Sequence, residues 1–134
     1  MTPEEFEQKV CHIHTILEGK NANVEWNAHI NDPDNQTQKR QIDVLITNDN
    51  EKTIIECRHH KRPQNVKWIE EIYGRRVSLN AFSAIAVSSS GFTKGAISKA
   101  ERLGIITRNF SELTAKEIES WGGKIDAKLF YVKF

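Results

Sequence analysis

Hydrophobic residues near the start of the chain recur every three or four positions, the spacing of one face of a helix: Phe6, Val10, Ile13 and Leu17. Pro3 and Gly19 mark the two ends of this predicted helix. The pattern then changes to strands over 22–30, 40–47 and 52–59, which polar turn segments separate. Because the connections are short, we expect these three strands to form an antiparallel meander.

The middle of the chain alternates helices with an almost wholly apolar strand. Pro63 precedes a second set of residues with helical spacing: Val66, Ile69, either Ile72 or Tyr73, and Val77. Residues 82–90, "FSAIAVSSS", lack polar alternation, which is typical of a strand that is covered on both faces. A third helix is predicted from a Thr93 cap to about Leu103, where Gly104 ends it.

The last part of the chain continues this alternation with shorter elements. Residues 105–110 indicate a short strand, and Thr114 with Glu117 has the spacing of a capping box for a short helix. Residues 124–134 indicate a terminal strand. The order αβββαβαβ(αβ) predicts an α/β fold in one domain over residues 1–134, with a mixed sheet flanked by helices on both sides.

Composition narrows the class of protein more than its function. The chain is 38% hydrophobic and 28% charged, it contains no apolar run long enough to span a membrane, and its start lacks the pattern of a signal peptide. Cys11 and Cys57 make no disulfide framework, so we expect a cytoplasmic protein with no membrane partner. The net charge of +1 argues neither for nor against nucleic-acid binding, but basic residues cluster locally, above all from Arg58 to Arg62.

Two acidic residues stand inside predicted strands, where a carboxylate is costly to bury. One face of strand 40–47 is expected to carry its alternating apolar residues: Ile42, Val44 and Ile46. Asp43 then shares the other face with Leu45, and in the next strand Glu56 shares its face with Arg58. Neighbouring positions are apolar on both faces, so each carboxylate needs an ion partner, hydrogen bonds or a metal.

Because the two strands are hairpin neighbours, Asp43 and Glu56 are expected to converge on one point. Two carboxylates beside a cation describe an oxygen-ligand site for Mg²⁺ or Mn²⁺. Such an ion binds a phosphodiester and lowers the pKa of an attacking water. The ordinary alternative is a cross-strand salt bridge from either carboxylate to Arg40 or Arg58, and the residue pattern alone leaves both alternatives open.

Three segments carry a resemblance to a known family. "RQIDVLI" (40–46), "IIECRHHKRPQNVKWIEEIYG" (54–74) and "SSSGFTKGAISKAERLGI" (88–105) resemble, in this order, segments of the Mrr-like restriction endonuclease group of the PD-(D/E)XK nuclease superfamily. The match covers about residues 4–107 and leaves 108–134 as a C-terminal helix–strand extension. The resemblance implies a restriction-endonuclease-like αβββαβ core and metal-dependent cleavage of DNA phosphodiester bonds.

The resemblance also assigns roles to particular residues. Asp43 matches the first metal-binding acid of the family and Glu56 the second, and the backbone carbonyl of Cys57 would be a third ligand. Many relatives have a further acid in the first helix, and Glu7 is the best match for it. The ordinary alternative for Glu7 is a solvated acid in the first helical turn.

Arg58 departs from the family pattern, because the family has a lysine at this position. Arginine stays charged at ordinary pH and cannot act as a general base, although it binds phosphate well. Three interpretations follow. Arg58 replaces the lysine electrostatically; or Lys61 or His59 supplies the missing role; or the site is catalytically weak and the protein is a DNA-binding or assembly module that retains the nuclease fold.

The remaining predicted contacts with DNA are basic or titratable residues around this site: Arg40, His59, His60, Arg62 and Lys94. Their ordinary alternative is a solvated basic surface. One active site cuts one strand, so double-strand cleavage predicts a homodimer. The chain has no room for a separate recognition domain, and a recognition partner subunit is therefore a further possibility.

Overall fold

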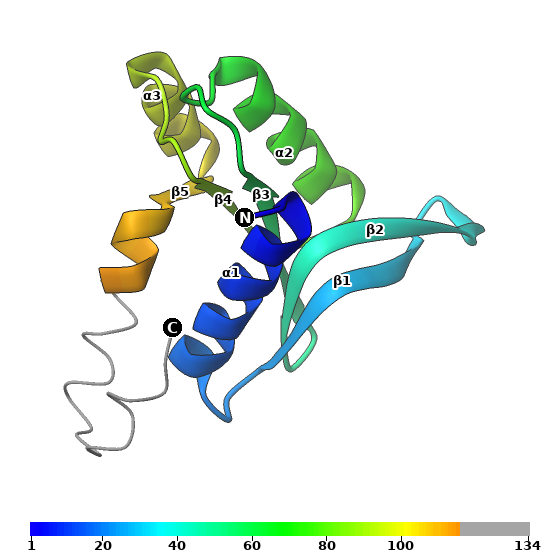
Figure 1. Cartoon of the computed structure of the whole chain (residues 1–134). Helices are drawn as coiled ribbons and strands as arrows, with labels where there is room; N and C mark the ends of the chain where they lie inside the picture. The colour runs from blue at the N-terminus through cyan, green and yellow to red at the C-terminus, as the bar shows by residue number, and fades with distance from the viewer. Residues whose placement is uncertain (116–134) are drawn as a thin grey trace, which may run out of the picture.

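A five-stranded mixed sheet forms the centre of the fold in the computed structural model, which describes residues 1–115 (Figure 1). The strands follow one another across the sheet in chain order: β1 (Asn23–Asp32), β2 (Asn35–Asn48), β3 (Glu51–Arg58), β4 (Ser83–Ser88) and β5 (Ile106–Asn109). Strands β1, β2 and β3 pair antiparallel, whereas β3, β4 and β5 pair parallel. The predicted meander, the mixed sheet and the α/β class are confirmed.

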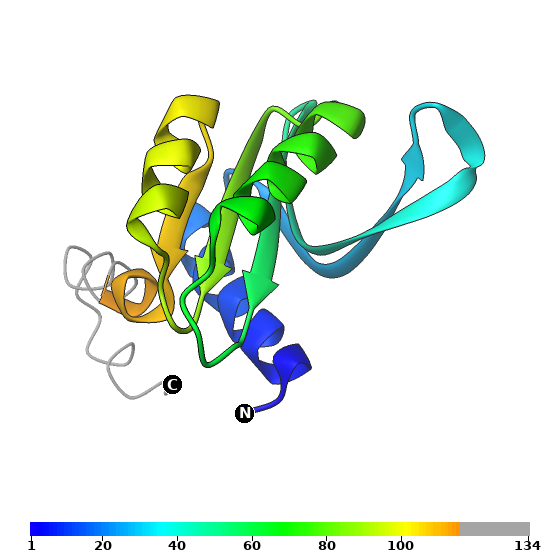
Figure 2. The ribbon, with the colours of Figure 1, turned by 90° about the horizontal axis from the view of Figure 1, so that it is seen from above.

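Helices cover both faces of the sheet. The helix α1 (Pro3–Glu18) lies on one face, and α2 (Val66–Ser78) and α3 (Lys94–Leu103) lie side by side on the other (Figure 2). Each face has its own apolar core. The core under α1 includes Val44 and Ile55, and the core under α2 and α3 includes Leu45 and Ile54. Strands with a helix layer on both sides explain the long apolar runs of the sequence.

The first helix is fixed at both ends by local chemistry. The Thr2 hydroxyl accepts a hydrogen bond from the Glu5 N–H at 3.1 Å, and the Glu5 carboxylate accepts one from the Thr2 N–H at 2.7 Å. This capping box satisfies two backbone donors at the start of the helix. Gly19 ends the helix with a φ of +63°, a value that favours glycine. The predicted boundaries of this helix are therefore correct.

The β1–β2 hairpin curves away from the rest of the sheet, and this curvature changes the predicted faces (Figure 1). Val44 and Ile46 pack under α1, but Ile42 packs in the core under α2 and α3. The prediction that these three residues share one face is wrong. Opposite this point, Asn27 has a φ of +53° between two regular β1–β2 pairs, and a left-handed residue disturbs the alternation of the strand.

The end of the described chain also departs from the prediction. A helical turn begins at Phe110, immediately after β5, and not at Thr114. Its capping box is formed by Asn109, whose side chain accepts from the Glu112 N–H at 3.0 Å while Glu112 accepts from the Asn109 N–H at 3.0 Å. The predicted terminal strand and the rest of the extension lie outside the described residues. Within residues 1–115, none of the helices has the length and apolar character that crossing a membrane requires.

Candidate active site

The candidate site lies where β2 and β3 separate. The two strands pair from their shared turn as far as Val44 and Ile55, and the next residues along are Asp43 and Glu56. At this point the Cys57 N–H donates a hydrogen bond to Asp43 Oδ2 at 2.9 Å. The Gln41 side chain donates to the other Asp43 oxygen at 3.2 Å. The carboxylate of Asp43 is thus fixed beside the backbone of β3, at the residue after Glu56.

Glu56 is a buried acid with incomplete pairing. Its side chain is 13% exposed, and its Oε2 atom has no hydrogen-bond partner among residues 1–115. The nearest cation is Arg75 of α2, whose Nη2 lies 3.7 Å from Oε2. Burial, and after it the charge of Asp43, raises the pKa of Glu56 to about 8, although Arg75 opposes the shift. A buried acid with a raised pKa and a like charge beside it is typical of a functional site.

Glu7 approaches the same place from α1. Its Oε1 accepts a hydrogen bond from the Trp26 indole N–H at 3.2 Å. Burial raises the pKa of Glu7, and the charge of Asp43 raises it further. Glu7 also raises the pKa of Glu56. The three carboxylates predicted from sequence therefore lie within electrostatic range of one another.

The donor chemistry of this cluster fits a hard divalent cation. Oxygen ligands suit Mg²⁺ and Mn²⁺, and Mg²⁺ is commonly held by one or two carboxylates together with waters and substrate phosphates. Asp43 and Glu56 supply two such carboxylates, and Oε2 of Glu56 accepts no hydrogen bond among residues 1–115, its ion pair with Arg75 being long at 3.7 Å. In residues 1–115, no group of three or more His, Cys, Asp or Glu side chains is placed to hold one metal ion. Glu7 is near the pair but does not complete a three-residue ligand set here.

Arg58 points toward α2 and is held by three of its neighbours. Its Nη1 donates to the Gln64 side-chain carbonyl at 3.1 Å, and its Nη2 lies 3.7 Å from the carboxylate of Glu71. The guanidinium also lies over the Trp68 ring, 5.0 Å from the ring centre. The side chain of Arg58 is 37% exposed, so it is held but not enclosed.

The salt bridges that formed the ordinary alternative are not made in the described part of the chain. Arg58 pairs with Glu71 and not with Asp43 or Glu56. Arg40 pairs with Asp32 at 2.8 Å, within the β1–β2 hairpin. Arg40 is therefore placed away from the carboxylate pair by an ion pair of its own.

Four residues that sequence reasoning missed lie along one line on the α2 side: Gln64, Trp68, Glu71 and Arg75. Trp68, Glu71 and Arg75 have the three- and four-residue spacing of one face of α2, and Gln64 lies in the loop before the helix. The first three contact Arg58 and the last faces Glu56. The three- and four-residue spacing of the α2 residues is visible in the sequence and is the signal that could have identified them.

The basic segment after β3 is tied to the loop after β4. The His59 ring stacks on Phe6 of α1 with 5.3 Å between ring centres. Ser89 donates to the carbonyl of His60 at 3.3 Å, and Ser90 donates to the carbonyl of Arg62 at 2.6 Å. The side chains of the predicted DNA-binding residues in this segment, together with Lys61, remain exposed. The segment is thus anchored by its backbone with its cations directed to solvent.

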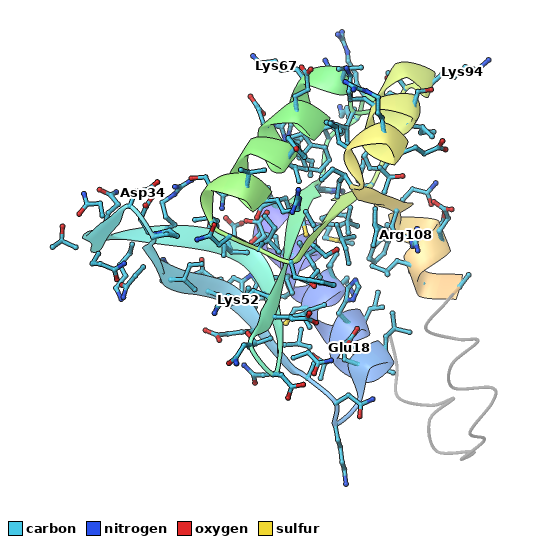
Figure 3. The ribbon with its side chains drawn as sticks, turned by 180° about the vertical axis from the view of Figure 1, so that it is seen from behind. Glu18, Asp34, Lys52, Lys67, Lys94 and Arg108 are labelled. Carbon is cyan, nitrogen blue, oxygen red and sulfur yellow. The ribbon has the colours of Figure 1, made fainter. Side chains whose placement is uncertain are left out.

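Lys94 lies in the first turn of α3 and is exposed. Figure 3 shows it at the same end of the two-helix layer as Lys67, at the start of α2. It is a surface cation of this helix layer, and it forms no ion pair within residues 1–115. The structure thus brings Glu7, Asp43 and Glu56 within electrostatic range, with Arg58 two residues after Glu56 on β3. Arg40 lies on β2, as Asp43 does, but pairs with Asp32, and Lys94 lies on α3.

Comparison with known proteins adds independent information. The restriction endonuclease family Mrr_cat matches residues 1–115 of the chain. No curated protein matches at a significant level. The matched region coincides with the part of the chain that the structure describes, and it contains every residue of the candidate site.

Solved structures share the fold at low sequence identity. The protein of unknown function AF1548 is 20% identical with a TM-score of 0.69, covering 87% of this chain and 67% of its own. Protein VC1899 from Vibrio cholerae is 19% identical with a TM-score of 0.68, covering 87% and 32%. Can2 from Sulfobacillus thermosulfidooxidans, solved with cyclic tetra-adenylate, is 17% identical with a TM-score of 0.68, covering 86% and 34%. This chain spans about a third of the length of the last two proteins.

Proposed function

The chain belongs to the Mrr_cat restriction endonuclease family, and from this premise we propose that it is a metal-dependent DNA endonuclease that hydrolyses phosphodiester bonds. One observation carries the proposal. Asp43 and Glu56 meet where β2 and β3 separate, and Glu56 is buried with one oxygen unpartnered among the described residues. A carboxylate that is mostly buried and incompletely paired destabilises the fold, whereas a bound cation would offset that cost.

Asp43 and Glu56 would hold Mg²⁺ or Mn²⁺, with the backbone carbonyl of Cys57 as a third ligand. When bound, the ion would supply charge neutralisation at the phosphate and a lower pKa for the attacking water. The protein's own contribution is positioning. The hydrogen bond from the Cys57 N–H keeps Asp43 in place, and Arg75 keeps the carboxylate of Glu56 directed toward α2.

The cations after Glu56 would face the substrate. Arg58 would stabilise charge on the phosphate, since a guanidinium binds phosphate oxygens in a bidentate manner but does not accept a proton. Lys61 is exposed on the adjoining segment and would supply the additional charge there. Glu7, which accepts a hydrogen bond from the Trp26 indole N–H, would hold a second metal ion or the water network beside Asp43. His59, His60 and Arg62 would contact the DNA backbone, and Arg40 and Lys94 would contact it farther away.

A DNA-binding or assembly module without turnover is a second candidate, and the position of Arg58 favours it. The guanidinium is occupied by Gln64, Trp68 and Glu71, all on the α2 side. A residue that is held in this way strengthens the fold at a place where relatives have a catalytic lysine. Under this alternative the carboxylate pair would bind a cation without cleavage.

Nicking of supercoiled plasmid in Mg²⁺ or Mn²⁺ separates the two candidates. We expect the wild type to nick, and Asp43→Asn to lose activity by at least about a hundredfold, because a metal-binding charge is removed. Asp34→Asn, the same change at an exposed position of the hairpin tip, should leave nicking unchanged. Nicking by Arg58→Lys but not by wild type would reject the nuclease proposal and support the binding module.

The assembly of the protein follows from the same proposal. One site cuts one strand, so cleavage of both strands would require a homodimer or two successive encounters. Residues 1–115 contain no separate recognition domain, so a partner subunit would supply the sequence specificity. We expect this activity in the cytoplasm, where DNA and free Mg²⁺ are both present.

A further inference from the structure

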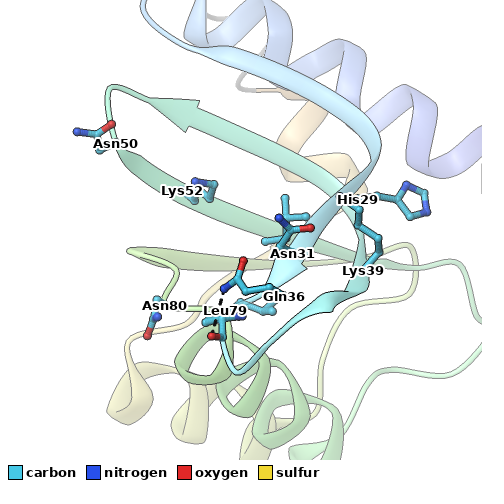
Figure 4. A pocket seen from close by; sticks show the side chains of 10 residues that line it. His29, Asn31, Gln36, Lys39, Asn50, Lys52, Leu79 and Asn80 are labelled. Carbon is cyan, nitrogen blue, oxygen red and sulfur yellow. Dashed lines mark hydrogen bonds between the residues drawn. The ribbon is translucent and has the colours of Figure 1, made fainter.

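A second concave surface lies at the other end of β3 from the carboxylate pair. It is a hollow of about 560 Å³, bordered by the β1–β2 hairpin, the turn between β2 and β3, and the C-terminal end of α2 (Figure 4). Lys39 contributes from β2 and Lys52 from β3, while Leu79 and Asn80 contribute from the end of α2. None of the residues predicted from sequence to act on DNA lines it.

The lining of this hollow is basic and rich in amides. Its ten residues include Lys39 and Lys52 and no Asp or Glu. Four of them are side-chain amides, which offer both donors and acceptors: Asn31, Gln36, Asn50 and Asn80. The acid that follows Asn31, Asp32, is neutralised by Arg40 at 2.8 Å. Asp49 in the adjacent turn and Glu51 at the start of β3 do not line the hollow. A polar, cationic surface of this kind suits a phosphate backbone better than an apolar small molecule.

The hollow is connected to the candidate active site by β2, β3 and α2. Lys39 comes four residues before Asp43 in β2, and Lys52 comes four residues before Glu56 in β3. Because these strands are antiparallel, the two lysines extend from the carboxylate pair in opposite directions, and the curved hairpin brings both to the hollow (Figure 1). On α2, Leu79 of the hollow follows Arg75 by about one helical turn.

From this arrangement we propose that the hollow binds the sugar–phosphate backbone of a double-stranded DNA whose cleaved phosphate lies at Asp43 and Glu56. Lys39 and Lys52 neutralise phosphates, and the surrounding amides bind phosphate or sugar oxygens. The proposal rests on the proposed function, since it takes the carboxylate pair as the place where the DNA is cut. It adds a second contact that fixes the direction of the duplex across the protein.

The test compares two double variants of the full chain that remove the same charge. Lys39→Ala with Lys52→Ala removes both cations of the hollow, and Lys9→Ala with Lys20→Ala removes two cations from α1 and the segment after it. The affinity for a fluorescent 20-base-pair duplex is measured by anisotropy in EDTA, over a series of salt concentrations. Thermal midpoints identify any variant that is not folded.

Each phosphate contact contributes about 0.9 to the slope of log affinity against log salt. We therefore expect the Lys39/Lys52 variant to bind about tenfold or more weakly at low salt, with a slope that is shallower by about two. The Lys9/Lys20 variant should match the wild type. Equal losses in both variants would indicate general electrostatic attraction and overturn the proposal. An unchanged Lys39/Lys52 variant would overturn it as well, and would leave the hollow to a protein partner.

The same proteins are then used for plasmid nicking, which separates this proposal from the proposed function. Nicking by wild type together with unchanged binding by the Lys39/Lys52 variant would reject the hollow and leave the nuclease. Absence of nicking together with the shallower salt slope would reject the nuclease and retain the hollow as the surface of a DNA-binding module. If a single-variant analysis shows that Lys39 or Lys52 alone accounts for the whole change, the two-phosphate contact is wrong.

Discussion

His14 provides a stability test that is independent of the active site. It lies on the buried face of α1 and is only 6% exposed. Both of its ring nitrogens lack a hydrogen-bond partner among residues 1–115. Burial, and after it the charge of Arg108, lowers the pKa of His14 to about 4. The folded protein therefore keeps this imidazole neutral under conditions in which the unfolded chain protonates it.

The sign of the effect follows from proton linkage. Between pH 6.5 and pH 4 the unfolded chain binds a proton at this position and the folded protein does not, so the free energy of unfolding decreases as the pH falls. From pH 7 to pH 4.5 the loss is about 2 kcal/mol at 1.36 kcal/mol for each unit of pKa difference. Below the folded pKa the loss levels off.

Two substitutions at this position separate the proton from the packing. His14→Gln removes the titration but keeps an amide that needs partners, so we expect it to abolish this part of the pH dependence without stabilising the protein. His14→Leu removes both the titration and the unpartnered nitrogens, and should raise the free energy of unfolding at pH 7 by about 1 kcal/mol. His12→Gln, on an exposed position of the same helix, should change neither quantity.

Urea unfolding at pH 7, 6, 5 and 4.5 measures these differences, provided that unfolding is two-state. The quantity of interest is the wild type minus His14→Gln, because other groups titrate in both proteins and cancel. If this difference does not change with pH, or if the wild type gains stability relative to His14→Gln on acidification, the neutral buried state of His14 is wrong.

Two further predictions concern the carboxylates and the helix that brings Glu7 to them. Burial raises the pKa of Glu56 to about 8 in the folded protein. From about pH 4.5 to 8 the folded state therefore holds a proton that the unfolded chain has lost, and the free energy of unfolding of the wild type decreases as the pH rises through that range. In EDTA at pH 8.5, Glu56→Gln should therefore be more stable to urea by about 2–4 kcal/mol, and an equally stable or weaker variant would contradict the shift. Thr2→Ala removes one half of the capping box and should lower the free energy of unfolding by about 1 kcal/mol, as measured by thermal unfolding. Thr15→Ala, the same change at an exposed position of the helix, should alter the free energy of unfolding by no more than a few tenths of a kcal/mol.

Most of the element order was predictable because local rules govern it. The start of α1 depends on Thr2, Pro3 and Glu5, and its end depends on Gly19, all of which act within a few residues. The strands follow from runs of apolar residues between polar turns, and short connections make neighbouring strands pair. The β4 run is apolar throughout because helices cover both of its faces. Such features need no knowledge of distant contacts.

The details that failed depend on contacts between distant segments. The face of Ile42 was wrong because the left-handed Asn27 lies on a different strand and shifts the local alternation. The cap of the last described helix was placed at Thr114 because Asn109 sits inside a predicted strand, where no cap is expected. In each case the sequence pattern was compatible with both positions, and packing selected one of them.

The candidate site divides in the same way. The pair of Asp43 and Glu56 was predictable, since adjacent hairpin strands bring facing residues together. The partners of Arg58 were not, because they come from α2 and depend on how the helix lies over β3. Arg75 was missed for the same reason, although it lies 3.7 Å from Glu56. The pattern of a single strand does not show which residues of a covering helix will contact it.

The contacts of Arg58 also determine how readily its guanidinium could bind a substrate phosphate. Its ion pair with Glu71 is long, at 3.7 Å, and the carboxylate is 50% exposed, so this pair contributes little. The firmer contact is with Gln64, which is buried and fixed by its own backbone bonds to the loop after β4. A guanidinium has five donors, and one bond to Gln64 leaves others for phosphate. Arg58 can therefore keep its bond to Gln64 while it binds a substrate, which a lysine ammonium could not do with the same planar geometry. Arg58 and its contacts with Gln64, Trp68 and Glu71 are thus one arrangement, and the bond to Gln64 is compatible with either a nuclease or a DNA-binding module.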